Sequence, residues 1–503
     1  MALTPAFDAF ARAYEAGENQ VVYSRLAADL DTPVSLMLKL TGAAKDAFVL
    51  ESVTGGEVRG RYSIIGMKPD LVWQCHGDTS RLNRQARFDP DAFEDMPGDP
   101  LSTLRSLIAE SRIDLPADLP KAAAGLFGYL GYDMIRLVEH LPDVNPDPLG
   151  LPDAMMIRPS VVAVLDGVKG EVTVVSPAWV NDGLSARAAY AQAAERVMDA
   201  VRDLERALPQ ASREMGEAQE PGPPVSNFTP EAYRAAVETA KDYIRRGDIF
   251  QVVPSQRWTQ DFALPPFALY RSLRRTNPSP FMFYFNFGGF QVIGASPEIL
   301  VRVFDREVTI RPIAGTRPRG TTPEEDDALE ADLLADRKEL AEHLMLLDLG
   351  RNDTGRVSKI GTVRPTEKFI IERYSHVMHI VSNVVGELAE DQDALSALLA
   401  GLPAGTVSGA PKVRAMQIID ELEPEKRGIY GGGVGYFSAG GDMDMCIALR
   451  TAIVKDAKLY IQAGGGVVYD SDPEAEFQET VHKSNAIRRA AADAARFTSS
   501  GNS

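Results

Sequence analysis

Two kinds of hydrophobic pattern follow one another along the chain and predict a mixture of strands and helices. Short apolar runs, such as VVAVLD (161–166) and EVTVVSP (171–177), predict buried strands. A segment rich in Ala, Arg and Glu follows them and predicts a helix through residue 207. The run FMFYFNFGGFQVIGAS (281–296) predicts a hairpin that turns at its Gly-Gly pair. Because no regular strand–helix–strand alternation connects these elements, we expect an α+β fold rather than a doubly wound sheet.

A segment rich in Pro, Gly and Glu, residues 213–231, interrupts the pattern and predicts an exposed linker. We therefore divide the chain into an N-terminal region (1–212), a linker (213–227) and a C-terminal domain (228–498). The domain opens with a predicted helix that has Thr229 as its N-cap, Pro230 in its first turn and Gly247 as its end. Strand patterns follow at 249–258 and 308–316.

One long helix is predicted over residues 321–353. Thr322 and Glu325 have the spacing of a capping box, and Pro323 suits the first helical position. Leucines at helical spacing predict its buried stripe, namely Leu329, Leu333, Leu340, Leu344 and Leu347. Near its middle, Glu339 and Glu342 lie three residues apart and hence on one face.

A second pair of glutamates occurs in SDPEAEFQET (471–480). Asp472 and Pro473 predict a helix start, after which Glu476 and Glu479 share one face. Glu-x-x-Glu is common on solvated helices, so each pair alone carries little information. If the two helices met, however, their four carboxylates would need a cation, and oxygen-only ligands suit Mg²⁺.

Composition limits the class of protein. The chain has 503 residues, of which 45% are hydrophobic and 25% charged, and a net charge of −18. That charge argues against nucleic-acid binding, and no apolar run approaches the length of a membrane span. The only cysteines, Cys75 and Cys446, form no metal or disulfide pattern. We expect a soluble cytoplasmic protein that binds neither nucleic acid nor membranes.

Several further residues remain ambiguous on spacing alone. The glycine triplets in IYGGGVGYFSAGG (429–441) and IQAGGGVVYD (461–470), at probable strand ends, could present amides to an anion or could form turns. Arg450 lies in an apolar strand pattern, either on an edge strand or as the partner of a buried carboxylate. Lys483 stands one turn after Glu479 and could simply pair with it. Of His376 and His379, either could be structural.

Taken together, six segments resemble the chorismate-utilising enzymes over residues 228–490. They are RPIAGTRPRG, DRKELAEHLMLLDLGRND, PAGTVSGAPK, GIYGGGVGYFS, QAGGGVVYDSDPEAEFQET and HKSNA, and they occur in the family's order. The N-terminal half, notably VLESV (49–53), is similar to the large subunits of anthranilate synthases within that family. The resemblance implies antiparallel sheets packed with helices, and a magnesium-dependent lyase that makes anthranilate and pyruvate from chorismate and ammonia for tryptophan biosynthesis.

The resemblance also implies roles for individual residues. Glu342 and Glu479 would bind Mg²⁺ directly, with Glu339 and Glu476 as more distant partners. His379 would assist loss of the pyruvyl group, and Thr406, Gln251 and Lys483 would belong to the same catalytic site. Chorismate would contact the residues Gly315, Thr316, Tyr430, Arg450, Gly464, Gly465 and Gly466.

Two positions indicate which nucleophile is used. Ala314 stands where aminodeoxychorismate synthases of this family carry a nucleophilic lysine, and Gln251 stands where isochorismate and salicylate synthases carry a lysine that activates water. Neither side chain present here can perform those roles at neutral pH. Both positions therefore favour ammonia. If they only fill space, the choice of product stays open, with aminodeoxychorismate synthase component I as the alternative.

The resemblance further implies a partner and an inhibitor. Neither cysteine lies in a glutaminase nucleophile elbow, so ammonia is expected from a separate glutamine amidotransferase subunit, component II, in a heterotetramer of two of each chain. Tryptophan would bind at VLESV and NPSPFM (277–282), through the residues Glu51, Ser52, Pro280, Phe281 and Met282. The family usually has Tyr where Phe281 stands. A tryptophan-binding regulatory protein with an inactive pocket is a rival hypothesis, which the full set of site residues disfavours.

Overall fold

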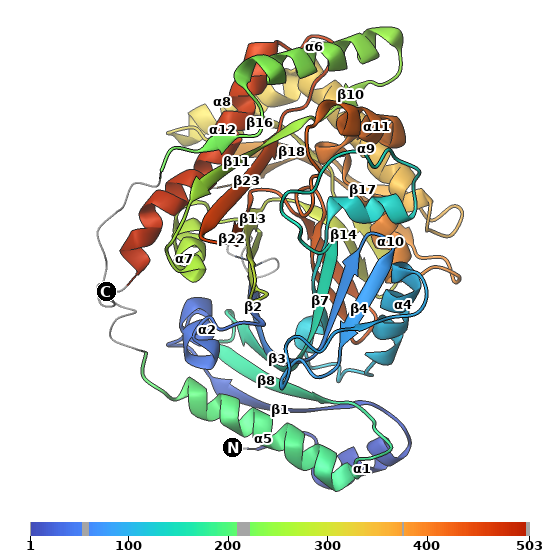
Figure 1. Cartoon of the computed structure of the whole chain (residues 1–503), viewed down its shortest axis with the longest axis vertical. Coiled ribbons are helices and arrows are strands. Elements are labelled where there is room, and N and C mark those ends of the chain that lie inside the picture. Colours follow the sequence, from blue (N-terminus) through green and yellow to red (C-terminus); the bar gives the residue numbers. More distant parts are fainter. Residues whose placement is uncertain (1, 53–59, 209–221, 375–376, 499–503) are drawn as a thin grey trace.

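The computed structural model describes residues 2–52, 60–208, 222–374 and 377–498 (Figure 1). Its α-helices are α1 (Phe7–Glu15), α2 (Pro33–Thr41), α4 (Pro100–Glu110), α5 (Ala186–Leu204), α6 (Pro230–Arg246), α7 (Pro266–Thr276), α8 (Pro323–Ala335), α9 (Arg337–Gly355), α10 (Ala394–Gly401), α11 (Lys412–Leu422) and α12 (Pro473–Asp493). Short 3₁₀ helices are η1 (Lys121–Ala123), η2 (Tyr132–Leu137), η4 (Gly405–Val407) and η5 (Ala494–Phe497). Within the described ranges, no helix is long and apolar enough to cross a membrane.

The strands of the N-terminal region are β1 (Gln20–Ala27), β2 (Ala47–Glu51), β3 (Tyr62–His76), β4 (Thr79–Asn83), β5 (Glu94–Asp95), β6 (Gly125–Leu130), β7 (Ala154–Asp166) and β8 (Glu171–Ala178). The remaining strands are β9 (Val225–Ser226), β10 (Gln251–Val252), β11 (Ser255–Asp261), β12 (Phe281–Asn286), β13 (Gln291–Ser296), β14 (Ile299–Phe304), β15 (Glu307–Ile310), β16 (Ile313–Pro318), β17 (Arg364–Arg373), β18 (Val377–Glu387), β19 (Gly409–Ala410), β20 (Gly433–Ser438), β21 (Met443–Ile447), β22 (Thr451–Lys455) and β23 (Lys458–Gly464). Their pairings are antiparallel, which confirms the α+β prediction.

Two long strands, β3 and β7, belong to two layers of sheet at once. The first half of β3 pairs with β2, and its second half pairs with β4, while β7 follows β3 along both halves. The register shifts between Pro69 and Leu71, directly after Lys68, whose φ of +53° is unusual for a residue other than glycine. Because proline cannot donate to the ladder, a bulge is the expected place for it. The bulge divides β3 where its partner strand changes.

From these shared strands, each layer continues into the C-terminal half of the chain. One layer runs from β2 through β12, β13, β22 and β23 to β11. The other runs from β7 through β6, β20, β21, β14 and β15 to β18, which also pairs with β16 and β17. The strand pairings β2–β12 and β6–β20 therefore cross the boundary predicted at 213–227. Most of that predicted linker lies outside the described residues, so the domain division stays a prediction.

Aromatic rings fill the space between the two layers. Phe48 of β2 stacks on Phe127 of β6 at 4.6 Å between centroids and on Phe285 of β12 at 5.1 Å. The ring of Phe48 also occupies the space over Gly66 of β3, where a Cβ atom would lie 2.2 Å from it. A side chain at Gly66 would therefore push apart the core that joins the N-terminal and C-terminal halves.

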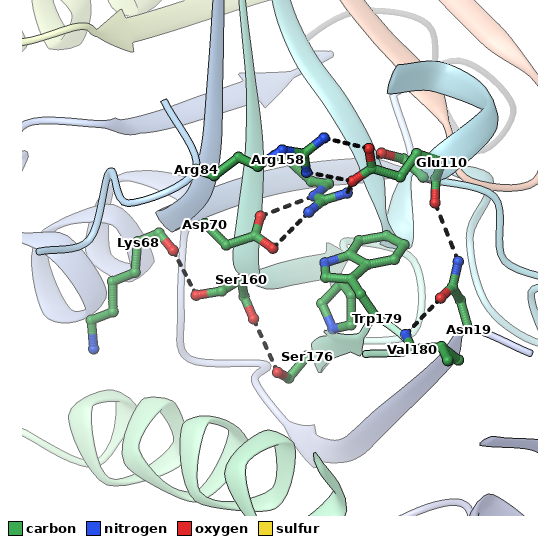
Figure 2. Close-up of polar contacts among 12 residues, drawn as sticks. Asn19, Lys68, Asp70, Arg84, Glu110, Arg158, Ser160, Ser176, Trp179 and Val180 are labelled. Carbon is green, nitrogen blue, oxygen red and sulfur yellow. Dashed lines mark hydrogen bonds and ion pairs between the residues drawn. The ribbon is translucent and has the colours of Figure 1, made fainter. Parts of the chain in front are cut away.

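A buried arginine fixes the N-terminal layer to α4 (Figure 2). Arg158 of β7 donates to both oxygens of Asp70, at 3.0 Å each, and to Glu110 at 3.1 Å, while its guanidinium lies 4.3 Å from the ring centre of Trp179. Arg84 binds both oxygens of Glu110 as well. The Arg84 guanidinium lowers the pKa of the Glu110 carboxyl, against the opposing effect of burial. A buried charge with this many partners is paired well enough to be tolerated in the interior.

The helices α6, α8, α9, α11 and α12 gather toward one end of the molecule, opposite α5 (Figure 1). There α12 packs against α6, α7 and β23, while α9 packs against β16 and β18. Several predicted helix ends are confirmed. Thr229 caps α6, with Pro230 in its first turn and Gly247 in the left-handed conformation after its end. Asp472 caps α12 by accepting from the amide of Ala475 at 2.9 Å, with Pro473 in the first turn. The hairpin at 281–296 is also confirmed.

The long helix predicted at 321–353 is two helices, so that prediction was wrong. The chain is extended at Asp336, whose carboxylate accepts from the amides of Lys338 and Glu339 and so starts α9. The Thr322 cap is present, but the Glu325 carboxylate bonds to Thr321 rather than closing the predicted box on Thr322. The continuous leucine stripe fails for the same reason. Leu333 and Leu347 are buried, but Leu344 is exposed. Leu344 was assigned to the stripe by continuing the helical spacing across Asp336, where the helix in fact ends.

Candidate active site

A cavity of about 460 Å³ brings together the residues that the sequence predicted for catalysis, chorismate and metal. Its wall comes from strand ends, from the loop around η4 and from the helices α9 and α12. Of the predicted residues, those lining it are Gln251, Gly315, Thr316, Glu339, Glu342, His379, Thr406, Tyr430, Arg450, Gly464, Gly466, Glu476, Glu479 and Lys483. Gly465 does not line the cavity, because its amide donates to the carbonyl of Pro254 and its Cα faces Glu476.

The two glutamate pairs reach this cavity from different helices. Asp336 caps α9 only three residues before Glu339, which places both glutamates of that pair within the first two turns. Asp472 caps α12 in the same way before Glu476 and Glu479. The two helix starts, not the middle of a long helix, therefore present the four carboxylates.

Each carboxylate has a different neighbour. Glu342 accepts from the Gln251 amide at 3.1 Å, Glu479 pairs with Lys483 at 2.7 Å, and Glu339 lies 3.6 Å from Arg317. Glu476 has one oxygen, Oε2, buried without a hydrogen-bond partner among the described residues. Burial raises the pKa of Glu476, and proximity to Glu479 adds to the effect. Burial and then Glu342 raise the pKa of Glu339. A cation in the cavity would relieve this repulsion.

The oxygen donors of this cavity suit Mg²⁺. Across the described ranges, no group of three or more His, Cys, Asp or Glu side chains stands close enough to form a preformed metal cage. Mg²⁺ does not need one, since it usually binds through one or two carboxylates, keeps several waters and meets an anionic ligand. Oxygen-only donors, an orphaned buried carboxylate oxygen and room for waters and a substrate carboxylate fit that mode of binding.

His379 projects from β18 into the cavity as a neutral imidazole. Burial lowers its pKa from the usual 6.5. Its Nδ1 lies 3.0 Å from the carbonyl oxygen of Gly315 and 3.0 Å from Thr316 Oγ1. A carbonyl oxygen can only accept, so Nδ1 carries the hydrogen and Nε2 is left as a proton acceptor. The other candidate, His376, lies outside the described residues.

Glu298 is a cavity residue that the sequence pattern did not predict. It follows β13 and accepts a hydrogen bond from Thr406 Oγ1 at 3.1 Å. Burial raises the pKa of its carboxyl to about 7, although Thr406, Arg450 and Lys483 oppose the rise. A carboxyl with that pKa can hold and release a proton near neutrality. The only signal in the sequence is one acidic residue within the apolar run VIGASPEILVRVF.

Arg450 supplies positive charge to the same wall. It lies in the bend between β21 and β22 with a φ of +46°, not within a strand as its pattern predicted. The bend ends the strand pattern there, and the side chain faces the cavity near Glu298. Burial lowers the pKa of Arg450, and the Glu298 carboxylate opposes that change. Lys483 bridges Glu479 and the carbonyl of Gly464, which it reaches at 2.9 Å.

A buried ion pair between Arg427 and Glu423 supports the wall of the catalytic cavity. The Arg427 side chain is 2% exposed and that of Glu423 is 3% exposed, and they pair at 2.6 Å. Arg427 also donates to the carbonyls of Val253 and Val407 at 2.6 and 2.5 Å, and its guanidinium lies 5.6 Å from the ring centre of Tyr430. One arginine therefore holds two backbone segments and an aromatic wall residue of the cavity.

A second cavity of about 310 Å³ contains the residues predicted to bind tryptophan. Glu51, Ser52, Pro280, Phe281 and Met282 all line it. The Glu51 carboxylate accepts from Arg274 at 2.6 Å and from the hydroxyl of Tyr270.

Other lining residues give this second cavity both aromatic walls and polar groups. Tyr62, Phe283, Phe304 and Tyr436 contribute rings. Three lining residues also carry a buried polar atom with no hydrogen-bond partner within the described part of the chain, namely Arg302 Nε, Arg311 Nε and Asp444 Oδ1. Aromatic walls combined with unsatisfied buried donors and an acceptor suit an aromatic molecule with charged groups.

The two cavities share a wall. Pro297 and Ile313 line both of them. In addition, Tyr374 of the second cavity contacts the ring of His379, which lines the first, edge to face at 5.6 Å between centroids. A molecule that displaces this wall from one side therefore acts on the other side as well.

Comparisons with known proteins agree along the chain. A family model described as chorismate binding enzyme matches residues 68–489. The anthranilate synthase component 1 of Cereibacter sphaeroides is 79% identical to this chain over 491 residues, which are 98% of each sequence.

Solved structures show the same fold. The anthranilate synthase component I of Streptococcus pneumoniae is similar at a TM-score of 0.76 and 37% identity, covering 93% of this chain and 99% of that one. The menaquinone-specific isochorismate synthase of Escherichia coli, with a TM-score of 0.68 and 19% identity, covers 97% of this chain and 99% of its own, and it shares the fold alone.

Proposed function

The chain belongs to the chorismate binding enzymes, within their anthranilate synthase component 1 group, and on that basis we propose that it converts chorismate and ammonia to anthranilate, pyruvate and water. We place this reaction at the first committed step of tryptophan biosynthesis. The observation that carries the proposal is one cavity in which glutamates from α9 and α12 meet His379, Glu298 and Arg450.

Magnesium is proposed as the cofactor. Glu342 and Glu479 would hold the ion directly, with Glu339 and Glu476 behind them. When bound, Mg²⁺ would supply fixed positive charge against the ring carboxylate of chorismate. Arg450 and the backbone at Gly466 would face the second carboxylate, that of the enolpyruvyl group.

The first chemical stage is the addition of ammonia at ring C2 with loss of the C4 hydroxyl. Hydroxide is a poor leaving group, so a proton must reach it as its bond to carbon breaks. The Glu298 carboxyl, with a pKa of about 7, can donate that proton so that water leaves, and the ammonium group formed at C2 then releases one proton to give the neutral amine. Thr406 holds the carboxyl in place through its hydrogen bond.

The second stage removes the pyruvyl group and makes the ring aromatic. His379 Nε2 can take the proton from C2, since Nδ1–H is held by the Gly315 carbonyl and burial keeps the ring neutral. The electron pair of the broken C–H bond enters the ring while the C3–O bond breaks. The departing enolpyruvate then takes up a proton and becomes pyruvate.

Two wall residues favour ammonia over other nucleophiles. Ala314 lines the cavity with a methyl group, which cannot attack the ring. The Gln251 amide donates to Glu342 and is no base at neutral pH. The relatives are named as component 1, which supports a second component, and we propose a glutamine amidotransferase in a heterotetramer of two of each chain.

The decisive experiment is an incubation with chorismate, magnesium chloride and ammonium. We expect blue-fluorescent anthranilate to form together with equimolar pyruvate, and EDTA to reduce the rate at least 100-fold until magnesium is restored. An amino product that retains its pyruvyl group would instead identify an aminodeoxychorismate synthase and contradict the proposal.

The variant Glu479→Ala is expected to lose turnover while still binding tryptophan. Unchanged turnover would overturn the assignment of the metal ligands.

Tryptophan is proposed as a feedback inhibitor that binds the second cavity. The aromatic walls would enclose the indole ring, and Glu51 and Ser52 would bind the polar end of the amino acid. The support is that five residues from two distant segments, predicted together from the sequence, line one cavity. Because the two cavities share a wall, a ligand bound in the second cavity would affect the catalytic cavity through that wall.

The variant Glu51→Gln is expected to raise the dissociation constant for tryptophan about 10- to 100-fold. Removing a charged hydrogen-bonding partner typically costs about 1.5–3 kcal/mol, which corresponds to this range. Isothermal titration calorimetry with tryptophan measures the change, and the tryptophan concentration for half-inhibition should rise by a similar factor. Because Glu51 pairs with Arg274, urea unfolding should accompany the titration to show that the variant is folded. An unaltered dissociation constant would contradict this site.

A further inference from the structure

The proposed reaction consumes ammonia that this chain is poorly equipped to make. Class I glutamine hydrolysis needs an accessible thiolate, and the sequence has only two cysteines. Both are buried. Burial raises the pKa of the Cys75 thiol to about 12 and also raises that of Cys446. Neither can serve as the nucleophile, so ammonia must enter the catalytic cavity from outside.

An exposed apolar patch borders the catalytic cavity, in which the ammonia would react. Phe250 is 71% exposed, Tyr469 is 61% exposed and Val413 is 37% exposed, and Pro411 is exposed as well. We call these four residues the rim patch. Isolated exposed apolar residues are ordinary, but several gathered at one place indicate a contact surface.

Backbone contacts bring the segments that carry the rim patch together. In the short ladder of β10 with β19, Gln251 stands opposite Ala410, and the amide of Phe250 donates to the Ala410 carbonyl at 2.7 Å. On the other side, Val252 pairs with Val467 in a single bridge. Phe250 stands two residues before this bridge and Tyr469 two residues after it, while the hydrogen bond to Ala410 brings Phe250 next to Pro411.

The same segments connect the patch to the cavity. Gln251 and Val468 line the cavity, whereas their chain neighbours Phe250 and Tyr469 are exposed. Each of the two segments therefore passes from the cavity wall to the exposed surface within one residue. Val413 follows in the first turn of α11, which packs on β10 and β19.

Charged and polar groups surround the apolar centre. Arg414 lies 3.7 Å from Asp248 and places its guanidinium 5.1 Å from the ring centre of Tyr243, whose hydroxyl bonds to Glu421. An apolar centre with a polar, charged rim is the usual anatomy of a protein–protein interface.

We propose that the rim patch is the docking surface of the glutamine amidotransferase subunit, a proposal that rests on the ammonia-consuming reaction proposed above. The position beside the cavity identifies this occupant. Ammonia released into bulk water is mostly protonated to ammonium, so a source that sits against the cavity delivers the reactive form more efficiently. A second copy of this chain, which lacks a usable thiol, would cover the same place without supplying ammonia.

The test uses two variants, Phe250→Asp and Tyr469→Asp, with Phe88→Asp as the matched control. Phe88 is equally apolar and is 86% exposed, but it belongs to the loop after β4, far in sequence from the cavity. Binding of each full-length variant to purified component II is measured by surface plasmon resonance. Anthranilate formation is measured with glutamine plus component II and, separately, with ammonium alone.

We expect the two rim variants to bind component II at least tenfold more weakly and to lose glutamine-dependent turnover in proportion. Turnover with ammonium is expected within about twofold of the unchanged protein, which also shows that the variants fold. The control should match the unchanged protein in every measurement. Binding within twofold of the unchanged protein, or an equal loss in Phe88→Asp, would overturn the proposal. Since binding is measured without turnover, failure of the proposed reaction would be seen separately, as absence of anthranilate with ammonium.

Discussion

Replacing Glu298 with glutamine is expected to lower kcat for anthranilate formation by about 10²–10⁴-fold, the range typical for loss of a general acid. Glutamine has the same shape and can still accept the hydrogen bond from Thr406, so the cavity wall should keep its geometry. What it cannot do is give a proton to the departing C4 hydroxyl. Initial rates of anthranilate fluorescence at saturating chorismate measure the loss.

The pH dependence identifies the role more specifically. A carboxyl whose pKa is raised to about 7 holds its proton below that pH and loses it above, so kcat/KM should fall as the pH rises through about 7. The comparison needs a constant concentration of free ammonia at every pH, because ammonium is deprotonated over the same range. In the opposite direction, kcat/KM should fall only below pH 6.5, where His379, with its lowered pKa, takes up a proton.

The conservative variant supplies the control for Glu298. Glu298→Asp keeps a carboxyl and should recover part of the lost rate, together with a fall in kcat/KM at high pH. Glu298→Gln should lose that fall altogether. If Glu298→Gln retained more than about a tenth of the original kcat, or kept the same alkaline limb, another group would have to be the proton donor.

Replacing Glu423 with glutamine is expected to lower the free energy of unfolding by about 3–5 kcal/mol, because it leaves the Arg427 charge buried without its carboxylate. Glu423 also accepts from the amide and the hydroxyl of Ser255, so the change weakens three contacts at once. Urea denaturation followed by circular dichroism should show an earlier midpoint. Since Arg427 holds the carbonyls of Val253 and Val407, we also expect KM for chorismate to rise.

An exposed pair of similar spacing is the matched control for this variant. Asp348 and Arg351 pair at 2.8 Å on the surface of α9, with side chains 58% and 54% exposed. Solvent screens such a pair, so Asp348→Asn should cost no more than about 1 kcal/mol. If Glu423→Gln cost as little as this control, the buried pair would not be what holds the cavity wall.

Local chemistry made some of the structure predictable from the sequence. The caps at Thr229 and Asp472 depend on a short polar side chain followed by proline, and both were correct. The hairpin at 281–296 depends on two apolar runs around a Gly-Gly pair, and it was correct as well. The gathering of the site residues, by contrast, came from resemblance to the family and not from spacing.

The errors arose where tertiary contacts decide. Asp336 looked like one more acidic residue within a helix, but it turns its carboxylate onto following amides and starts a new one. Arg450 looked like a strand residue, yet the chain bends there with a positive φ. Gly465 looked like its neighbours in the triplet, although its amide is already taken by Pro254. Glu298 could not be recognised at all, since its raised pKa depends on groups distant in the sequence.

If tryptophan binds the second cavity as proposed, the wall shared through Pro297 and Ile313 has a thermodynamic consequence. Coupling between two binding equilibria is reciprocal. The factor by which tryptophan weakens the binding of chorismate therefore equals the factor by which chorismate weakens the binding of tryptophan. As chorismate accumulates, tryptophan would therefore bind the enzyme more weakly. With tryptophan bound as proposed, the wall between the cavities would make the rate of the pathway depend on the supply of chorismate as well as on the demand for tryptophan.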